Sequence, residues 1–143
     1  MTGAPELIRV VERRVRDYLE ARLRWEVEAQ QLSKRGEREG TLGTQINVIK
    51  AGYKSLLSEF FASEVVDREP RYAFGDPPSV DPARTKVLDV HVTGGRASVT
   101  TKEPGHPLLD DPTFEYQLRL VEGTWRILDR IETVGGRRIK RVF

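Results

Sequence analysis

Apolar residues recur at helical spacing in two segments of the first half of the chain. The first stripe is Leu7, Ile8, Val11, Val15, Tyr18 and Leu19, and the second is Ile46, Ile49, Tyr53, Leu56, Leu57 and Phe60. Each set falls on one face of a helix, so the pattern predicts two amphipathic helices. Pro5 suits the first turn of the first helix, which we expect to reach about Gln31. Thr44 suits the N-cap of the second helix, and the polar segment 33–40 predicts a mobile loop between the two.

Beyond Lys86 the hydrophobic period changes from helical to alternating. The alternating segments are residues 88–92, 97–101, 114–120, 125–131 and 138–142. Gly94-Gly95 and Glu122-Gly123 are typical hairpin turns, so the first four segments predict two β-hairpins. Four prolines between residues 67 and 82 predict an irregular connection between helices and strands.

The order of these elements predicts the fold class. Helices followed by four or five antiparallel strands are an α+β order, with the helices on one face of the sheet. Short glycine turns cannot join parallel strands, which excludes a doubly wound nucleotide-binding fold. With 143 residues, the chain fits one domain.

Composition narrows the function classes further. The chain has no Cys and two His, so we expect no disulfide, no cysteine nucleophile and no metal site, and we expect no cofactor. The formal net charge of +2 is too small for a strong nucleic-acid binder, and the terminal cluster Arg137, Arg138, Lys140 and Arg141 suits a solvated edge strand. No apolar run approaches the roughly 20 residues of a membrane span. A charged amphipathic start argues against a signal peptide, so the expected location is the cytoplasm.

Asp129 is the most informative carboxylate in the sequence. Strand alternation places it on the same face as Trp125 and Ile127, which we expect to point toward the helices. A carboxylate shielded from water in this way can serve as a general base. Two structural alternatives remain open: Asp129 pairs with a buried cation, or the strand twists enough for it to reach solvent.

Arg22 is a second unusual residue, because it projects onto the apolar face of the first helix. Its guanidinium either binds an acidic group of a ligand, pairs with Glu26 one turn later, or reaches water. A pair between Arg22 and Asp129 would explain both residues together. His91 is expected on the outer sheet face and His106 in a loop, and neither has a sequence neighbour that forms a catalytic dyad.

Two segments resemble a known superfamily. The turn and strand Gly123-Thr124-Trp125-Arg126-Ile127 resemble nuclear transport factor 2-like domains, in which helices pack on a curved antiparallel sheet to form a cone. Residues 71–82, RYAFGDPPSVDP, together with 86–101 resemble the immunity proteins of bacterial polymorphic toxin systems that use this fold. Their shared features here are Pro77-Pro78, the strand 97–101 and Trp125-Arg126-Ile127. The superfamily likeness covers nearly the whole chain, and the immunity-protein likeness covers about residues 71–131.

The resemblance implies a protein that binds a cognate toxin domain and blocks it without catalysis. The surface for such binding would come from segments 33–43, 67–82 and 103–112. The candidate toxin-binding residues in these segments are Asp76, Asp81, His106, Asp110 and Asp111. In segment 103–112, Asp110 and Asp111 suit a basic toxin such as a nuclease.

The superfamily also contains isomerases, dehydratases, cyclases and carriers, so two alternatives remain. The first is a small enzyme or carrier that holds an apolar ligand inside the cone. Its interior would then be lined by Arg22, Trp125 and Asp129, with Asp129, Tyr18 and Tyr53 as candidate catalytic residues. The second is a subunit that forms a homodimer through the outer face of the sheet.

Overall fold

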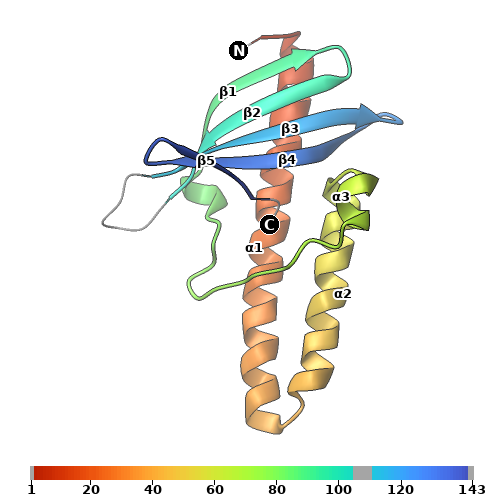
Figure 1. Ribbon diagram of the computed structural model, residues 1–143, viewed down its shortest axis with the longest axis vertical. Coiled ribbons are helices and arrows are strands. Elements are labelled where there is room, and N and C mark those ends of the chain that lie inside the picture. The colour runs from red at the N-terminus through yellow and green to blue at the C-terminus, as the bar shows by residue number, and fades with distance from the viewer. Residues whose placement is uncertain (1, 105–110, 142–143) are drawn as a thin grey trace.

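The computed structural model describes residues 2–104 and 111–141 and packs N-terminal helices on an open antiparallel sheet (Figure 1). The helices are α1 (Pro5–Glu39), α2 (Leu42–Phe60), α3 (Ser63–Asp67) and the 3-10 turn η1 (Pro82–Arg84). The strands are β1 (Lys86–Thr93), β2 (Arg96–Lys102), β3 (Thr113–Val121), β4 (Thr124–Val134) and β5 (Arg137–Lys140). They lie in chain order across the sheet, each antiparallel to the next. The predicted α+β class is confirmed.

The first helix is longer than the sequence pattern indicated. Residues 33–39, predicted as a mobile loop, continue α1 to Glu39, and the helix ends at Gly40 with a φ of 69°. Gly36 permits this arrangement, because a Cβ there would lie 2.8 Å from the Cα of Leu42 at the start of α2. The two helices therefore approach closely and reverse direction within Gly40 and Thr41, which makes Thr41 rather than Thr44 the residue before α2.

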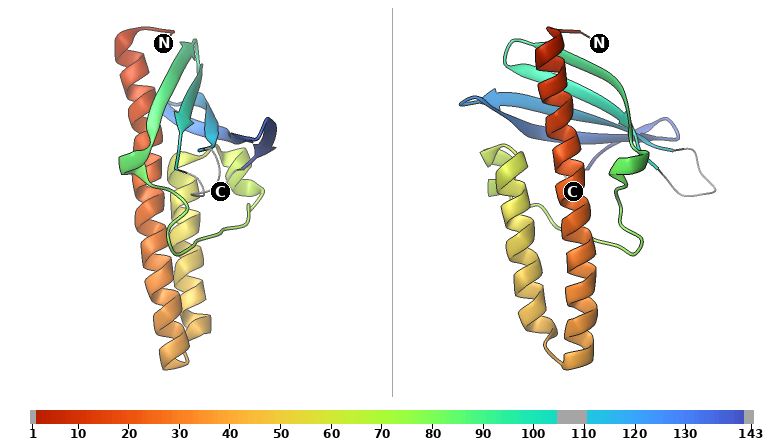
Figure 2. Two further views of the ribbon diagram at one scale, coloured as in Figure 1. Left: turned by 90° about the vertical axis from the view of Figure 1, so that its left-hand side faces the viewer. Right: turned by 180° about the vertical axis from the view of Figure 1, so that it is seen from behind.

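Only part of this helical hairpin covers the sheet. The views in Figures 1 and 2 agree that the N-terminal half of α1 lies against the strands, while its C-terminal half extends beyond them beside α2. The irregular segment 68–81 crosses this extension. Its Tyr72 and Phe74 pack edge-on against Trp25 of α1, with ring centroids 6.1 and 5.9 Å apart. Aromatic contacts of this kind stabilise the hairpin where no strand covers it.

A β-bulge changes which side chains of β4 face the helices. Gln117 of β3 lies opposite Asp129, whereas its neighbour Leu118 lies opposite Ile127, so Leu128 is an extra residue in β4. An extra residue reverses the inward and outward alternation beyond it. Ile127 before the bulge and Arg130 after it are therefore both buried.

Candidate functional site

The inner face of the sheet carries a buried ion pair. Arg130 is 5% exposed and donates through Nε to the hydroxyl of Tyr116 at 3.0 Å. Its Nη2 lies 3.3 Å from Oε1 of Glu103, and its guanidinium lies 3.8 Å from the ring centroid of Phe114. The other oxygen of Glu103 accepts hydrogen bonds from Tyr116 at 2.8 Å and from Thr101 at 2.7 Å. Both carboxylate oxygens are thus held by neighbouring side chains.

The same surroundings fix the protonation states of this cluster. Burial raises the pKa of the Tyr116 hydroxyl well above its ordinary value, and the nearby Arg130 offsets only part of that effect. Burial alone would lower the pKa of Arg130, but Tyr116, Tyr18 and Glu103 outweigh it and the pKa is raised. At neutral pH, Tyr116 is therefore a neutral donor and Arg130 a fixed cation.

A second buried ion pair lies on α1. Glu26 is fully buried, and its Oε2 lies 3.3 Å from Nε of Arg22, which is 3% exposed. Arg22 also donates to the hydroxyls of Tyr18 and Ser79, each at 3.1 Å. Glu26 accepts two further hydrogen bonds from Ser79, at 3.1 Å from the backbone N–H and 2.7 Å from Oγ. Of the alternatives for Arg22, pairing with Glu26 is confirmed.

The two buried clusters meet through the rings of Tyr18 and Tyr116, whose centroids are 6.2 Å apart. Tyr18 is fully buried and also contacts the rings of Phe60 and Phe61 edge-on. Trp125, another predicted cavity residue, is 5% exposed. Tyr18, Arg22 and Trp125 therefore lie in the interior as predicted, where they take part in packing and hydrogen bonding.

The prediction that Asp129 faces the helices is wrong. The bulge at Leu128 places Asp129 opposite Gln117 on the outer face, and Arg130 takes the inward position. The Oδ1 of Asp129 lies 3.9 Å from Nζ of Lys140 on β5. The suggested pair between Arg22 and Asp129 does not form, and Asp129 is not placed to act as a base in the interior.

His91 lies on the outer sheet face, as predicted, with half of its side chain exposed. It nevertheless has a partner near in sequence, contrary to expectation. The Nε2 of His91 lies 2.6 Å from Oδ2 of Asp89, two residues earlier on the same face of β1. Because both side chains are exposed, this contact contributes little to stability.

The candidate toxin-binding residues are only partly brought together. Asp76 lies 3.2 Å from Lys34 of α1, and Asp81 lies 4.0 Å from Arg84. Asp111 is exposed. His106 and Asp110 lie outside the described residues. Segment 33–43 is the turn of the helical hairpin, so it presents a helix end in place of the predicted loop.

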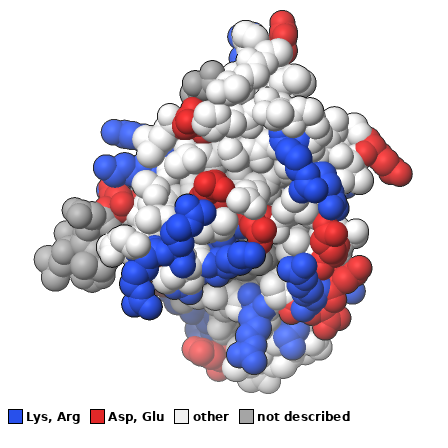
Figure 3. All heavy atoms as spheres, turned by 45° about the horizontal axis from the view of Figure 1, so that its top comes forward, with Lys and Arg blue, Asp and Glu red and all other residues white. Residues whose placement is uncertain are grey.

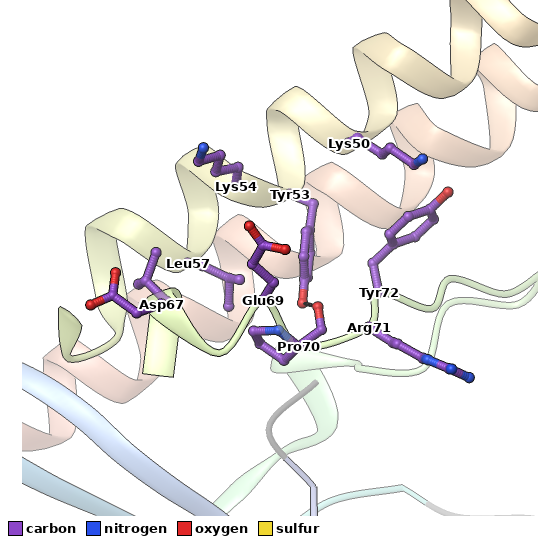
Figure 4. A pocket seen from close by; sticks show the side chains of 10 residues that line it. Lys50, Tyr53, Lys54, Leu57, Asp67, Glu69, Pro70, Arg71 and Tyr72 are labelled. Carbon is purple, nitrogen blue, oxygen red and sulfur yellow. Dashed lines mark hydrogen bonds between the residues drawn. The ribbon is translucent and has the colours of Figure 1, made fainter. Parts of the chain in front are cut away.

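A surface cleft that the sequence did not suggest has a volume of about 710 Å³ and lies between α2 and residues 66–72 (Figure 4). We call it the α2 cleft, and it is lined by Lys50, Tyr53, Lys54, Leu57, Val66, Asp67, Glu69, Pro70, Arg71 and Tyr72. The hydroxyl of Tyr53 donates to the carbonyl of Pro70, which ties α2 to the opposite wall. Burial raises the pKa of Tyr53 to about 12. Tyr53, predicted as an alternative catalytic residue, therefore lies in the floor of this cleft.

Neither Glu103 nor Arg130, the two residues of the buried ion pair on the sheet, was identified from the sequence, and the reasons differ. Glu103 continues the inward alternation of Ala97, Val99 and Thr101, so the strand pattern could have identified it. Arg130 gave no comparable signal, because the bulge that turns it inward cannot be read from the alternation of β4.

Metal-binding clusters, membrane spans and similarity to known proteins each bear on the function of this chain. In the described ranges, no group of three or more His, Asp or Glu side chains is placed to hold a metal ion. Within the same ranges, no helix combines the length and hydrophobicity needed to cross a bilayer. Comparison with protein-family models, with curated proteins and with solved structures finds no match.

Alkaline titration tests the description of the buried tyrosines. Tyr53 and Tyr116 are expected to stay protonated at pH 10, where an unperturbed tyrosine is half ionised, and Tyr53 should ionise near pH 12. Because both pKa values are raised in the folded state, their stabilisation is present below about pH 10 and is lost as pH rises above that value. Ultraviolet difference absorbance measures the ionisation, and urea unfolding from pH 9 upward measures the stability. Simultaneous titration of all four tyrosines near pH 10 would contradict this.

Proposed function

We propose that this chain binds a cognate toxin domain and neutralises it by direct protein–protein contact. The observation that carries this proposal is the contrast between the charged side chains of the interior and those at the surface. In the interior, Arg22 pairs with Glu26 and Arg130 pairs with Glu103. Around the α2 cleft, by contrast, charged side chains point into solvent. The interior charges serve the fold, and those at the surface are accessible to a protein partner.

The resemblance of the sequence supports the same proposal. Residues 71–82 together with 86–101, and Trp125-Arg126-Ile127 in β4, resemble immunity proteins with a nuclear transport factor 2-like fold. The order of two long helices followed by an antiparallel meander is compatible with that fold. Members of this group act by surface complementarity, which needs no catalytic residue.

The surface charges favour a protein partner over a nucleic acid. Seen from the sheet side, Lys and Arg side chains are interspersed with Asp and Glu around an uncharged area (Figure 3). Binding to nucleic acid depends on a continuous field of positive charge. The alternative of an enzyme or carrier with an internal ligand has weaker support, because Asp129 lies on the outer face.

Capture followed by a toxicity assay tests the proposal. The tagged chain is used to isolate proteins from a lysate of its source cell, and each captured protein is then expressed with and without the chain. We expect one stoichiometric partner that is toxic alone and harmless when co-expressed. Captured proteins that are all harmless alone, or that stay toxic in co-expression, would refute the proposed function.

Substitution of Asp129 separates this function from the enzyme alternative. Asp129→Asn should leave neutralisation unchanged and alter the free energy of unfolding by less than about 1 kcal/mol, because its partner Lys140 is exposed and the two charged atoms are 3.9 Å apart. Neutralisation is measured by growth in co-expression, and unfolding is measured in urea. Loss of neutralisation by a variant of normal stability would favour a chemical role for Asp129.

A further inference from the structure

The α2 cleft has an apolar floor between walls that come from distant parts of the chain. Leu57 and Tyr53 of α2 are 2% and 7% exposed, and with half-buried Val66 and Pro70 they form the floor. A volume of about 710 Å³ lies within the range of natural ligand-binding pockets. The cleft can therefore accept an apolar side chain of a partner together with its neighbours.

The rim of the cleft carries five charged side chains, all of them exposed: Lys50, Lys54, Asp67, Glu69 and Arg71. Across the described residues, none of the five forms an ion pair within the chain. Elsewhere on the surface such pairs are frequent, as Lys34–Asp76 and Arg119–Glu64 illustrate. The rim charges are thus accessible to an external partner without the loss of an internal contact.

The two ends of the cleft carry opposite charges. Figure 4 shows Lys50 and Tyr72 toward one end and Asp67 toward the other, with Lys54 and Glu69 between them. Arg71 lies on the same side as Tyr72. A ligand that fits must therefore present opposite charges at its two ends, which a segment of protein chain does readily.

The cleft is held in shape by contacts on both walls. The ring of Tyr53 lies 5.5 Å from that of Tyr72 and 5.8 Å from that of Trp25, measured between centroids. Glu69 adopts a φ of 49° just after α3, and its N–H donates to the carbonyl of Val66 at 3.0 Å, so the chain turns from α3 into the cleft wall in the usual left-handed helix cap.

The geometry points to the α2 cleft as the docking site for an extended segment of the partner protein. An apolar side chain of this segment packs on Val66 and Pro70, the accessible part of the floor. An acidic side chain on one side of that anchor faces Lys50 and Arg71, and a basic side chain on the other side faces Asp67. Only one part of this assignment rests on the proposed function, namely that the segment belongs to the toxin partner.

Selection from a display library of random peptides tests this site without knowledge of the partner. We expect enriched peptides to contain an apolar residue flanked by an acidic and a basic residue. Their dissociation constants should rise about 30-fold for the variant K50E/R71E, because two attractive contacts become repulsive. The matched control R137E/R138E makes the same charge change on exposed β5 residues, and it should alter binding about twofold or less.

Charge exchange in the peptide tests the orientation of the segment. A peptide whose acidic residue is replaced by Lys should bind K50E/R71E more tightly than it binds the unsubstituted chain. The variants K50E/R71E and R137E/R138E are first compared with the unsubstituted chain by urea unfolding, which should show both of them folded because all four positions are exposed.

Several outcomes would overturn the assignment. These are a lack of enriched peptides, peptides that bind K50E/R71E as well as the unsubstituted chain, and equal loss of binding in the β5 control. Self-association of the chain that K50E/R71E abolishes would instead make a second copy the occupant.

The failure of the docking site can be distinguished from failure of the proposed function. If K50E/R71E neutralises a captured toxin as well as the unsubstituted chain does, the docking site is wrong but the proposed function stands. If no toxin is neutralised while peptides still require the cleft, the function fails and the site remains.

Discussion

Replacing Glu103 with Leu is expected to lower the free energy of unfolding by about 3–5 kcal/mol. The substitution removes the carboxylate that faces Arg130 and leaves that guanidinium buried without its ionic partner. It also removes the acceptor for the hydroxyls of Tyr116 and Thr101. Because domains are typically stable by about 5–15 kcal/mol, the loss is a large fraction of the total. Urea unfolding of the purified chain, followed by circular dichroism, measures it.

The double variant E103L/R130M is the matched control. It removes both charges and fills the site with apolar side chains, so it should recover most of the stability that E103L loses. The partly exposed pair between Arg141 and Glu132, 3.7 Å apart, supplies a second comparison, and Glu132→Gln should cost less than about 1 kcal/mol. If E103L cannot be purified folded, Glu103→Gln replaces it in the cycle with R130M. If the single variant Glu103→Leu, or Glu103→Gln in its place, loses less than about 1 kcal/mol, the buried pair does not stabilise the sheet.

Much of the fold follows from hydrophobic periodicity. The stripe from Val11 to Leu19 predicted a helix that covers the sheet, and these residues are buried. Alternation around Gly94 and Gly123 predicted the two hairpins at their observed positions. Such predictions succeed where one face of an element is buried, because burial then constrains every second or every third to fourth residue.

The failures occur where local pattern does not determine the structure. The end of α1 is polar, so its sequence resembles a loop, and only the close contact of Gly36 with α2 shows why it stays helical. In β4, Ile127, Leu128 and Ile131 are all apolar, so the pattern fits a regular strand and a bulged strand equally well. The placement of Asp129 depended on that choice. The α2 cleft was missed because its walls are joined only by tertiary structure.

The second ion pair connects the interior to the α2 cleft. Glu26 accepts hydrogen bonds from the backbone N–H and the hydroxyl of Ser79, and Ser79 lies near the end of the irregular segment 68–81. The same segment supplies Glu69, Arg71 and Tyr72 to the cleft. The buried carboxylate of Glu26 therefore positions one wall of the α2 cleft. Substitution of Glu26 should accordingly alter the structure of that wall and binding at the cleft.

Glu26→Leu is accordingly expected to lower the free energy of unfolding by about 3–5 kcal/mol and to loosen residues 68–81. The reason is that Arg22 stays buried without its carboxylate, and Ser79 loses the acceptor for both of its donors. Urea unfolding measures the first effect, and amide hydrogen exchange resolved along the chain measures the second.

Ser79→Ala is the control that separates these two effects, because it keeps the ion pair of Arg22 and Glu26 and removes only the hydroxyl. It should cost about 0.5–1.5 kcal/mol and increase exchange in residues 68–81 with little change in α1. R22M/E26L should regain stability but still exchange faster in that segment, because Ser79 remains without its acceptor. Unchanged exchange in residues 68–81 of Glu26→Leu would show that the rings of Tyr72 and Phe74 against Trp25 hold the cleft wall without the ion pair.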